Sequence, residues 1–433
     1  MKTSHSFDER FQFQGRAKTW SLVMIAIGVI GIAAGFLLGA PERTFSNLLL
    51  NGYYLACVCT CGVLFCAIQY VAQAGWSASI LRIPQAFATV LPKAAIILLV
   101  IICAGLYFTH PGLNVDGKQT ILPYLYKEWA LKGVTDPKDT INYNDIIAGK
   151  SGFLNVPFFL IRLVTYLGCY SLLGWLLVKY SNNEDELGGM FNYNKSFKIS
   201  IIFLVIFGFT VPLFAFDTIM SLEAHWFSTM FGWYNFAALW VGGMAVITLT
   251  LILLKEGGYI PWVTEDHLHN MGQLLFGFSI FWTYLWFGQF LLTWYANIPE
   301  EAAYFYKRWE PEFKPWFWLN IIVNFAAPLL VLMSRDSKRA IKVLKTACII
   351  LICGHWLDYW QMIMPGTIGP QSSLFGPGDS KSSFLFGIGP LEIAIFVGFA
   401  GLFMFMMLTA LSKFKSLAPK KHPLLEESLH HHI

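Results

Sequence analysis

Ten separate apolar runs, each long enough to cross a lipid bilayer as a helix, constrain this chain more than any other feature. A helix needs about 20 mostly apolar residues to span the hydrocarbon core of a membrane. Runs of about this length lie near residues 19–39, 47–72, 86–108, 153–178, 198–217, 229–254, 272–295, 316–333, 341–364 and 389–412. Backbone polar groups find no water in lipid, so each run is expected to be an α-helix. The sequence therefore predicts an all-α, polytopic integral membrane protein with about ten transmembrane helices.

The composition agrees with this class and excludes others. Hydrophobic residues make up 56% of the 433 positions and charged residues only 13%. The net charge of +4 is small, and the basic residues are scattered over many loops. A nucleic-acid partner is therefore not expected, because such a partner requires a concentrated basic face. Lipids, lipid-soluble molecules and other subunits are the expected partners.

The distribution of basic residues predicts the orientation. An even number of spans places both termini on one side of the membrane. Lys and Arg accumulate in short cytoplasmic loops, and most of them fall on the side of the termini. The short loops of the other side carry only Arg43, Lys307, Arg308, Lys314 and Lys381. We therefore predict that both termini are cytoplasmic and that the long loop 109–152 is an ordered lid on the outside.

Residues 207–236 join two apolar runs through a short polar turn. Asp217, Glu223 and His225 lie in or beside this turn. Ionisable groups at membrane depth are costly and usually functional. The turn is therefore a candidate for proton handling or for contact with a polar headgroup. An ordinary interfacial turn with solvated acids is the alternative interpretation.

Few other ionisable residues lie inside the apolar runs. They are Lys93, Arg162, Lys345, His355, Asp358 and Glu392. Lys345 is close enough to a helix end for its ammonium group to reach the interface. Arg162 lies too deep for that and should face a carboxylate, a carbonyl or a polar cavity. Tyr166, one helical turn further, points the same way.

His355 and Asp358 are three residues apart and share one face of the ninth run. A histidine that exchanges its proton with a carboxylate is a candidate proton relay or quinone contact. A structural hydrogen bond inside the bundle is the alternative. In the predicted topology, the groups on the outer side form one acidic vestibule; they are Asp217, Glu223, His225, Asp358 and Glu392. The inner halves of the runs contain Lys93 and Lys345 but no Asp or Glu, so no complete carboxylate relay is predicted.

Small and kinking residues indicate how the helices pack. Gly28, Gly31 and Gly35 form a stripe that permits close helix contact, and Gly398 with Gly401 form another. The general enrichment of glycine in membrane spans is the alternative explanation. Pro157, Pro212 and Pro328 are expected to bend or locally open their helices.

No pattern for a redox metal centre is present. Cys57, Cys59 and Cys61 are two residues apart, so in a helix they face different directions and are read as small buried side chains. Only His355 lies well inside the membrane, whereas a bis-histidine haem needs two such residues. Cys-x-x-Cys-His, Walker and Rossmann patterns are missing. The tail ending in three histidines is interpreted as surface-exposed, with weak metal binding as the alternative.

Three stretches carry a resemblance to a known family. They are FDTIMSLEAHWFSTMFGWYNF, FSIFWTYLWFGQFLLTWYANIPEE and the tail KHPLLEESLHHHI. Together with the ten-run layout, they resemble the F subunit of bacterial alternative complex III, a quinol:electron-acceptor oxidoreductase. The membrane subunits of that complex are similar to the NrfD-like anchor of polysulfide reductase.

The resemblance implies a fold and a set of boundaries. It implies two four-helix bundles, 47–217 with the periplasmic loop 109–152, and 218–364. The first helix, within 19–46, and the last, within 365–412, would be peripheral. The segments 1–18 and 413–433 would be cytoplasmic, and the membrane would be the bacterial inner membrane.

The resemblance also implies a function and partners. The chain would help to build a quinol site or move protons, without a redox metal of its own. Quinone or menaquinone would be the lipid-soluble substrate. A sister NrfD-like subunit, an iron–sulfur subunit and multihaem cytochrome c subunits would be partners, with a terminal oxidase as a further candidate. A secondary transporter and a purely structural anchor are the alternatives; a transporter of this kind would show paired broken helices.

Overall fold

The computed structural model describes residues 10–114, 117–368 and 387–430, and 75% of the structure is helical. The α-helices are α1 (Arg16–Leu37), α2 (Pro41–Val71), α3 (Arg82–Tyr107), α4 (Asp145–Gly149), α5 (Val156–Leu187), α6 (Met190–Thr218), α7 (Thr229–Glu256), α8 (Glu265–Ala296), α9 (Pro299–Arg308), α10 (Lys314–Ile321), α11 (Ala327–Val331), α12 (Arg335–Arg339), α13 (Ile341–Thr367), α14 (Pro390–Leu411) and α15 (Leu425–Leu429). The short elements are η1 (Gly75–Ile80), η2 (Met220–Glu223), η3 (Ile322–Ala326) and the antiparallel strands β1 (Thr109–Leu113) and β2 (Gln119–Pro123).

The long helices coincide with the apolar runs. Within the described residues, nine helical segments are long and apolar enough to cross a membrane, counting α10, η3 and α11 as one segment, Lys314–Val331. The helix α13 has a similar length but contains Lys345, His355 and Asp358, which make it more polar. The prediction of a largely helical protein with many apolar spans is therefore confirmed.

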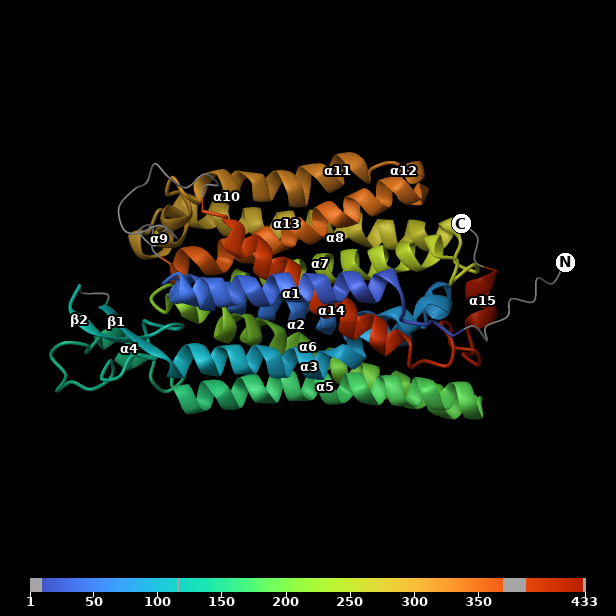
Figure 1. Cartoon of the computed structure of the whole chain (residues 1–433), viewed down its shortest axis with the longest axis horizontal. Coiled ribbons are helices and arrows are strands. Elements are labelled where there is room, and N and C mark those ends of the chain that lie inside the picture. Colours follow the sequence, from blue (N-terminus) through green and yellow to red (C-terminus); the bar gives the residue numbers. More distant parts are fainter. Residues whose placement is uncertain (1–9, 115–116, 369–386, 431–433) are drawn as a thin grey trace.

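The helix contacts form two rings. In the first, α2 contacts α3, α3 contacts α5, α5 contacts α6, and α6 contacts α2. In the second, α7 contacts α8, α8 contacts η3 and α11, these contact α13, and α13 contacts α7. The two rings also contact each other: α2 and α6 of the first ring contact α7 of the second, and α2 contacts α13. Figure 1 shows α3 and α5 along one edge of the molecule and α10 and α11 along the opposite edge.

The helices α1 and α14 pack tightly on each other. A Cβ atom built on Gly28 would lie 2.4 Å from Gly398 Cα, and one on Gly401 would lie 2.5 Å from Met24 Cβ. A Cβ atom on Gly31 would come within 2.8 Å of Ala394 Cβ. The two glycine stripes predicted from the sequence therefore permit a close helix–helix contact.

The prolines act differently from one another. Pro157 occupies the first turn of α5, where its missing N–H costs nothing, so it starts this helix and does not bend it. This corrects the expectation of a kink. Pro212 lies inside α6, which continues to Thr218. Pro328 lies just after the π-helical turn η3. The regular α-helical hydrogen bonding of the segment Lys314–Val331 is therefore interrupted near Pro328, as predicted.

The molecule has two distinct ends (Figure 1). We call the end with η1, α12 and α15 the tail end, and the end with β1, β2, α4 and α9 the loop end. At the loop end, the Tyr126 hydroxyl donates to Thr218 O at 2.9 Å, and Trp129 Nε1 donates to Ser221 O at 3.0 Å. The described part of loop 109–152 is thereby held over the turn between α6 and α7.

The C-terminal tail is docked on the tail end. His422 is buried between the rings of Tyr70 and Tyr193, and Ser428 Oγ donates to Trp76 O at 2.7 Å. The expectation of an exposed tail is therefore wrong for most of this segment, because apolar and hydroxyl side chains find partners on the bundle. His430 is exposed, and residues 431–433 lie outside the described residues, as does Lys381.

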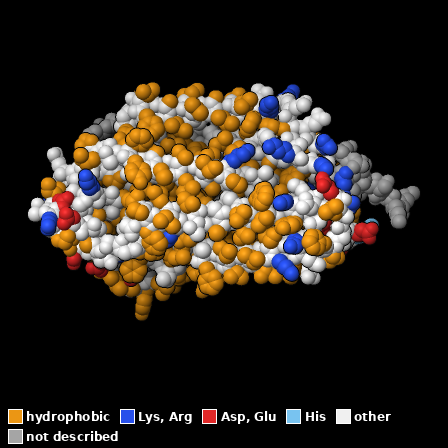
Figure 2. Space-filling model, turned by 90° about the horizontal axis from the view of Figure 1, so that it is seen from below, with side chains coloured by type: hydrophobic (Ala, Val, Ile, Leu, Met, Phe, Trp, Pro, Cys, Tyr) orange, Lys and Arg blue, Asp and Glu red, His pale blue; other side chains and the backbone are white. Residues whose placement is uncertain are grey.

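A wide band of apolar side chains covers the middle of the surface (Figure 2). Lys and Arg gather towards the tail end in the same view, and acidic side chains lie near both ends. Exposed apolar residues on the outer helices contribute to this band, including Ile161 and Leu172 on α5 and Phe209 on α6. Such a band matches the hydrocarbon layer of a membrane.

The α1–α14 contact generates a stability prediction. Gly28→Leu should lower the unfolding free energy by about 1–3 kcal/mol, because the added side chain has no space against Gly398. Gly168→Leu is the matched control, since a Cβ atom at Gly168 meets nothing within 4 Å. Thermal unfolding in detergent measures both variants. Equal melting temperatures for the two variants would contradict the packing described here.

Candidate functional site

Asp358 lies fully buried at the centre of the second ring of helices. The Tyr234 hydroxyl on α7 donates a hydrogen bond to its carboxylate. Trp282 Nε1 on α8 and Asn320 Nδ2 on α10 each donate another, at 2.8 Å. Asn324 Nδ2 in turn donates to Asn320 Oδ1 at 2.6 Å. Three helices, α7, α8 and α10, therefore supply neutral donors to one carboxylate on α13.

His355 is buried beside Asp358 but is not hydrogen-bonded to it. Its Nδ1 lies 3.7 Å from Asp358 Oδ2, beyond hydrogen-bond length, so the two side chains are not directly hydrogen-bonded to each other. Neither ring nitrogen of His355 has a hydrogen-bond partner among the described residues. The Trp282 ring, 5.7 Å away between centroids, contacts the imidazole edge to face and itself donates to the carboxylate. The two groups are close enough for electrostatic coupling, and the histidine is free to bind a further polar group.

Arg162 meets the carboxylate expected for it. Its Nε and Nη2 donate to Asp217 at 2.9 and 2.7 Å, a bidentate pair between α5 and α6. Its Nη1 donates to Phe153 O at 2.9 Å. Tyr166 is buried and interacts electrostatically with both members of the pair. This arrangement is a fixed ion pair that joins two helices.

Glu223 forms a second ion pair at the loop end. Its Oε1 accepts from Arg308 Nη2 at 2.9 Å, and its Oε2 accepts from Lys307 Nζ at 3.1 Å. Burial alone would raise the pKa of Glu223, but the two cations outweigh burial and hold that pKa below its usual value. Arg308 is itself buried and also donates to Gln361 O at 2.8 Å and Tyr304 O at 2.7 Å. The pair ties α9 to the turn after α6 and to α13.

His225 and Glu392 have separate partners. His225 Nδ1 lies 2.9 Å from Oε2 of Glu128, a residue of loop 109–152. Glu392 is buried and accepts from Arg43 Nε at 2.6 Å and Asn47 Nδ2 at 2.9 Å, which joins α14 to α2. These contacts are structural links between segments that are distant in sequence.

The structure does not bring the predicted acidic vestibule together as one cluster. Asp217, Glu223, His225 and Glu392 each have an ionic partner of their own, as described above. Asp358 differs because no Lys or Arg pairs with it in the described part of the chain. The same residues contain no group of three or more His, Cys, Asp or Glu side chains placed to hold a metal ion.

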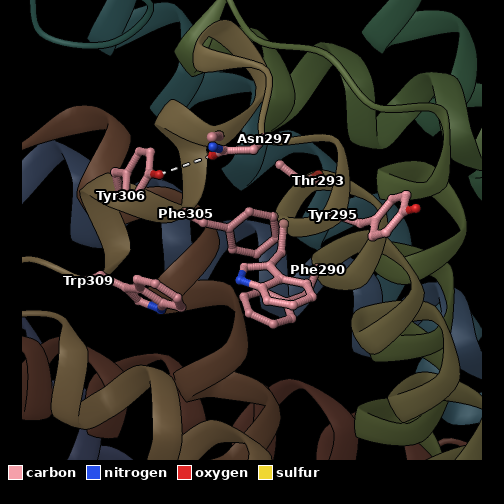
Figure 3. A pocket seen from close by; sticks show the side chains of 9 residues that line it. Phe290, Thr293, Tyr295, Asn297, Phe305, Tyr306 and Trp309 are labelled. Carbon is pink, nitrogen blue, oxygen red and sulfur yellow. Dashed lines mark hydrogen bonds between the residues drawn. The ribbon is translucent and has the colours of Figure 1, made fainter.

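An aromatic cavity of about 420 Å³ opens at the loop end between α8 and α9. Figure 3 shows Phe290 and Phe305 close together with Trp309 beside them. Tyr306 and Asn297 face each other across the rim, where Tyr306 OH donates to Asn297 Oδ1 at 3.3 Å. The cavity therefore combines flat apolar walls with a polar edge.

A smaller void connects this region with the Asp358 network. It shares Phe305 with the aromatic cavity and is also lined by Arg308, Asn320 and Tyr234. Its volume of about 20 Å³ holds about one water. Two of these lining residues, Asn320 and Tyr234, donate directly to Asp358.

Glu184 is a buried carboxyl group that the sequence analysis missed. It is 0% exposed, and neither carboxyl oxygen has a hydrogen-bond partner among the described residues. The helix α5 extends to Leu187, well beyond the predicted end at 178, and carries Glu184 into the tail end of the bundle. The tail end of the bundle, which the sequence predicts to be the cytoplasmic side, therefore does contain a buried acid. The continuing helical run NNEDEL was the available signal.

The apolar surface and the long helices define the class of protein: this is a multi-pass α-helical membrane protein. Comparison with protein-family models and with curated proteins finds no match to the chain. The resemblance to the F subunit of alternative complex III therefore rests on the sequence stretches alone and stays a prediction.

The Glu223 ion pair generates a stability prediction. Arg308→Gln should lower the unfolding free energy by about 3–5 kcal/mol, because it leaves a buried carboxylate with only an exposed partner. Lys307→Gln removes that exposed partner and should cost less than about 1 kcal/mol. Thermal unfolding in detergent at neutral pH compares the two. A larger loss of stability in Lys307→Gln than in Arg308→Gln would show that the buried Arg308–Glu223 pair contributes less to stability than the Lys307–Glu223 pair.

His422 generates a pH prediction. Burial, with a contribution from Arg82, lowers its pKa from 6.5 to about 4. Between pH 4 and pH 6.5 the docked tail binds fewer protons than the released tail. Above pH 6.5 His422 is neutral in both states, so protonation does not weaken docking there. Docking should then weaken by up to about 1.4 kcal/mol per pH unit as the pH falls towards 4. Proteolysis of the tail at pH 7.5 and pH 5 measures this. In His422→Phe the acid-induced increase in cleavage should disappear; if it persists, another group controls docking.

Proposed function

We propose that this chain is an integral membrane subunit of a respiratory quinol:electron-acceptor oxidoreductase of the alternative complex III kind. In this proposal it contributes a wall of the quinol site and a proton-accepting carboxylate, and it carries no redox metal of its own. Electrons leave through haem or iron–sulfur centres of partner subunits.

The observation that carries the proposal is the environment of Asp358. A fixed Arg or Lys beside a carboxylate favours its ionised form, as Arg308 and Lys307 do for Glu223, whose pKa they hold below its usual value. Asp358 instead has three neutral donors and lies 3.7 Å from a histidine that has no hydrogen-bond partner in the described part of the chain. Because histidine gains and loses protons near neutral pH, this pair is suited to accept a proton and pass it on.

The aromatic cavity supports a quinol near this pair. Quinol rings are flat and apolar with hydroxyl groups at two edges, and the cavity offers aromatic walls beside Asn297 and Thr293. The smaller void behind it has room for about one water between the cavity side and the donors of Asp358. Quinol oxidation releases two protons and two electrons per molecule. The protons would pass by this route to Asp358 and His355, and the electrons would pass to the partner subunit.

The same proposal includes a topology. We propose that the two rings of helices are the two four-helix bundles, with α1 and α14 peripheral. The loop end would face the periplasm, and both termini would be cytoplasmic, in the bacterial inner membrane. The gathering of Lys and Arg near the tail end supports this orientation.

The alternative functions have less support. A secondary transporter of the inverted-repeat kind would have broken helices in matching positions of two halves. The described spans contain one π-helical break, η3, in the second ring. A purely structural anchor would not explain why Asp358 is buried without a Lys or Arg partner in the described chain. We therefore propose the redox subunit.

The proposal predicts a specific functional loss. Asp358→Asn should reduce the rate of quinol oxidation by about 10²-fold or more, as removal of a positioned acid–base group does. Lys118→Gln is the control, because Lys118 is exposed and donates only to Thr140 O, at 2.8 Å in the outer loop. The assay uses the assembly purified from membranes through this chain. Equal activities of the two variants would refute a role for Asp358.

A second readout separates loss of function from loss of assembly. The Asp358→Asn assembly should still copurify with haem- and iron–sulfur-bearing subunits in wild-type amounts. His355→Gln should reduce activity in the same direction without loss of these subunits. If the wild-type chain purifies without any cofactor-bearing partner, the proposed function itself is contradicted.

A further inference from the structure

A second cavity lies towards the tail end, whereas the aromatic cavity opens at the loop end. It has a volume of about 390 Å³ and lies between α3, α5 and the end of α14. Its apolar lining includes Pro92, Val178 and Phe414, and its polar lining includes Lys179, Asn183 and Lys413. The cavity thus has an apolar wall and a basic rim formed by Lys179 and Lys413.

The basic rim has no acid to neutralise it in the described part of the chain. Lys179 and Lys413 are both exposed, and neither takes part in an ion pair there. Three acids follow Lys179 on α5. Glu184 is 0% exposed, Asp185 pairs with Arg82, and Glu186 accepts from Lys415 Nζ at 2.6 Å. Lys179 Nζ lies over the Trp175 ring, 5.0 Å from its centroid, which holds the ammonium group near the cavity. Two positive charges therefore face one cavity.

Neighbouring residues extend the site in both directions. Lys93 is exposed one helical turn beyond Thr89 on α3. Because α3 begins at the tail end and side chains tilt towards the start of their helix, the Lys93 ammonium group reaches back towards the cavity. Towards the middle of the band, Ile96 and Leu172 are exposed by 62% and 56% and leave an apolar track on the surface.

We infer that this cavity binds an anionic phospholipid, with the phosphate between Lys179 and Lys413 and the acyl chains along α3 and α5. A free phosphate would use only the rim, whereas a phospholipid matches both the rim and the apolar track. Basic pockets between helices at the cytoplasmic surface favour such headgroups. This inference does not depend on the proposed redox function.

The test is a titration of purified protein with phosphatidylglycerol, read by native mass spectrometry and by the melting temperature. The variant Lys179→Gln/Lys413→Gln should bind phosphatidylglycerol about thirtyfold more weakly, because each lysine near the headgroup contributes about fivefold. Lys195→Gln/Lys198→Gln is the charge-matched control, as both residues are exposed on α6 at the same end. The control should bind like the wild type.

Two further arms identify the ligand. Phosphatidylcholine, which has the same phosphate but no net charge, should bind more weakly than phosphatidylglycerol. Inorganic phosphate at millimolar concentration should not compete; competition would assign the rim to a soluble anion and overturn the inference. Equal loss in the control variant would also overturn it, because binding would then be a general surface effect.

Discussion

A charge inside an apolar bundle is stable only if an opposite charge or several hydrogen-bond donors meet it, and this requirement organises the loop end of the protein. Arg162 and Asp217 join α5 to α6, Arg308 and Glu223 join α9 to the turn after α6, and Arg43 and Glu392 join α2 to α14. Each pair fixes elements that are far apart in sequence. The result is a set of fixed links within the first ring, between the first ring and α14, and between α9 and the turn that joins the two rings.

Asp358 lies in a different environment. It accepts hydrogen bonds from neutral donors on three helices and lies near a histidine, and in the described part of the chain no Lys or Arg pairs with it. The π-helical turn η3 follows α10, and Asn324 in that turn donates to Asn320. Such turns are frequent at functional sites. The proposed proton handling depends on this contrast between the ion pairs and a carboxylate that has no fixed cation.

The sequence predicted the spans well, because apolar length and backbone burial in lipid leave few alternatives. It also predicted that Arg162 faces a carboxylate, a carbonyl or a polar cavity, since an arginine at that depth cannot reach water, and the structure shows both a carboxylate and a carbonyl. It could not predict which acids share a site, because Arg308, Glu128 and Arg43 reach their partners only through tertiary packing. The single vestibule was therefore wrong. Glu184 was missed because a hydropathy window ends where polar residues begin, although the helix continues.

Asn320 and Asn324 show what a closer sequence analysis can find. They are four residues apart in an apolar run, and such amides share a helix face. Their partner Asp358 lies on another helix, so the spacing identifies a polar face but not its contact.

The exchange of a proton at Asp358 is the central claim of the proposed function. Redox-difference infrared spectroscopy of the membrane-extracted assembly tests it most directly. A carboxyl band that appears on quinol addition and is lost in Asp358→Asn is predicted; an identical spectrum in that variant would contradict the account.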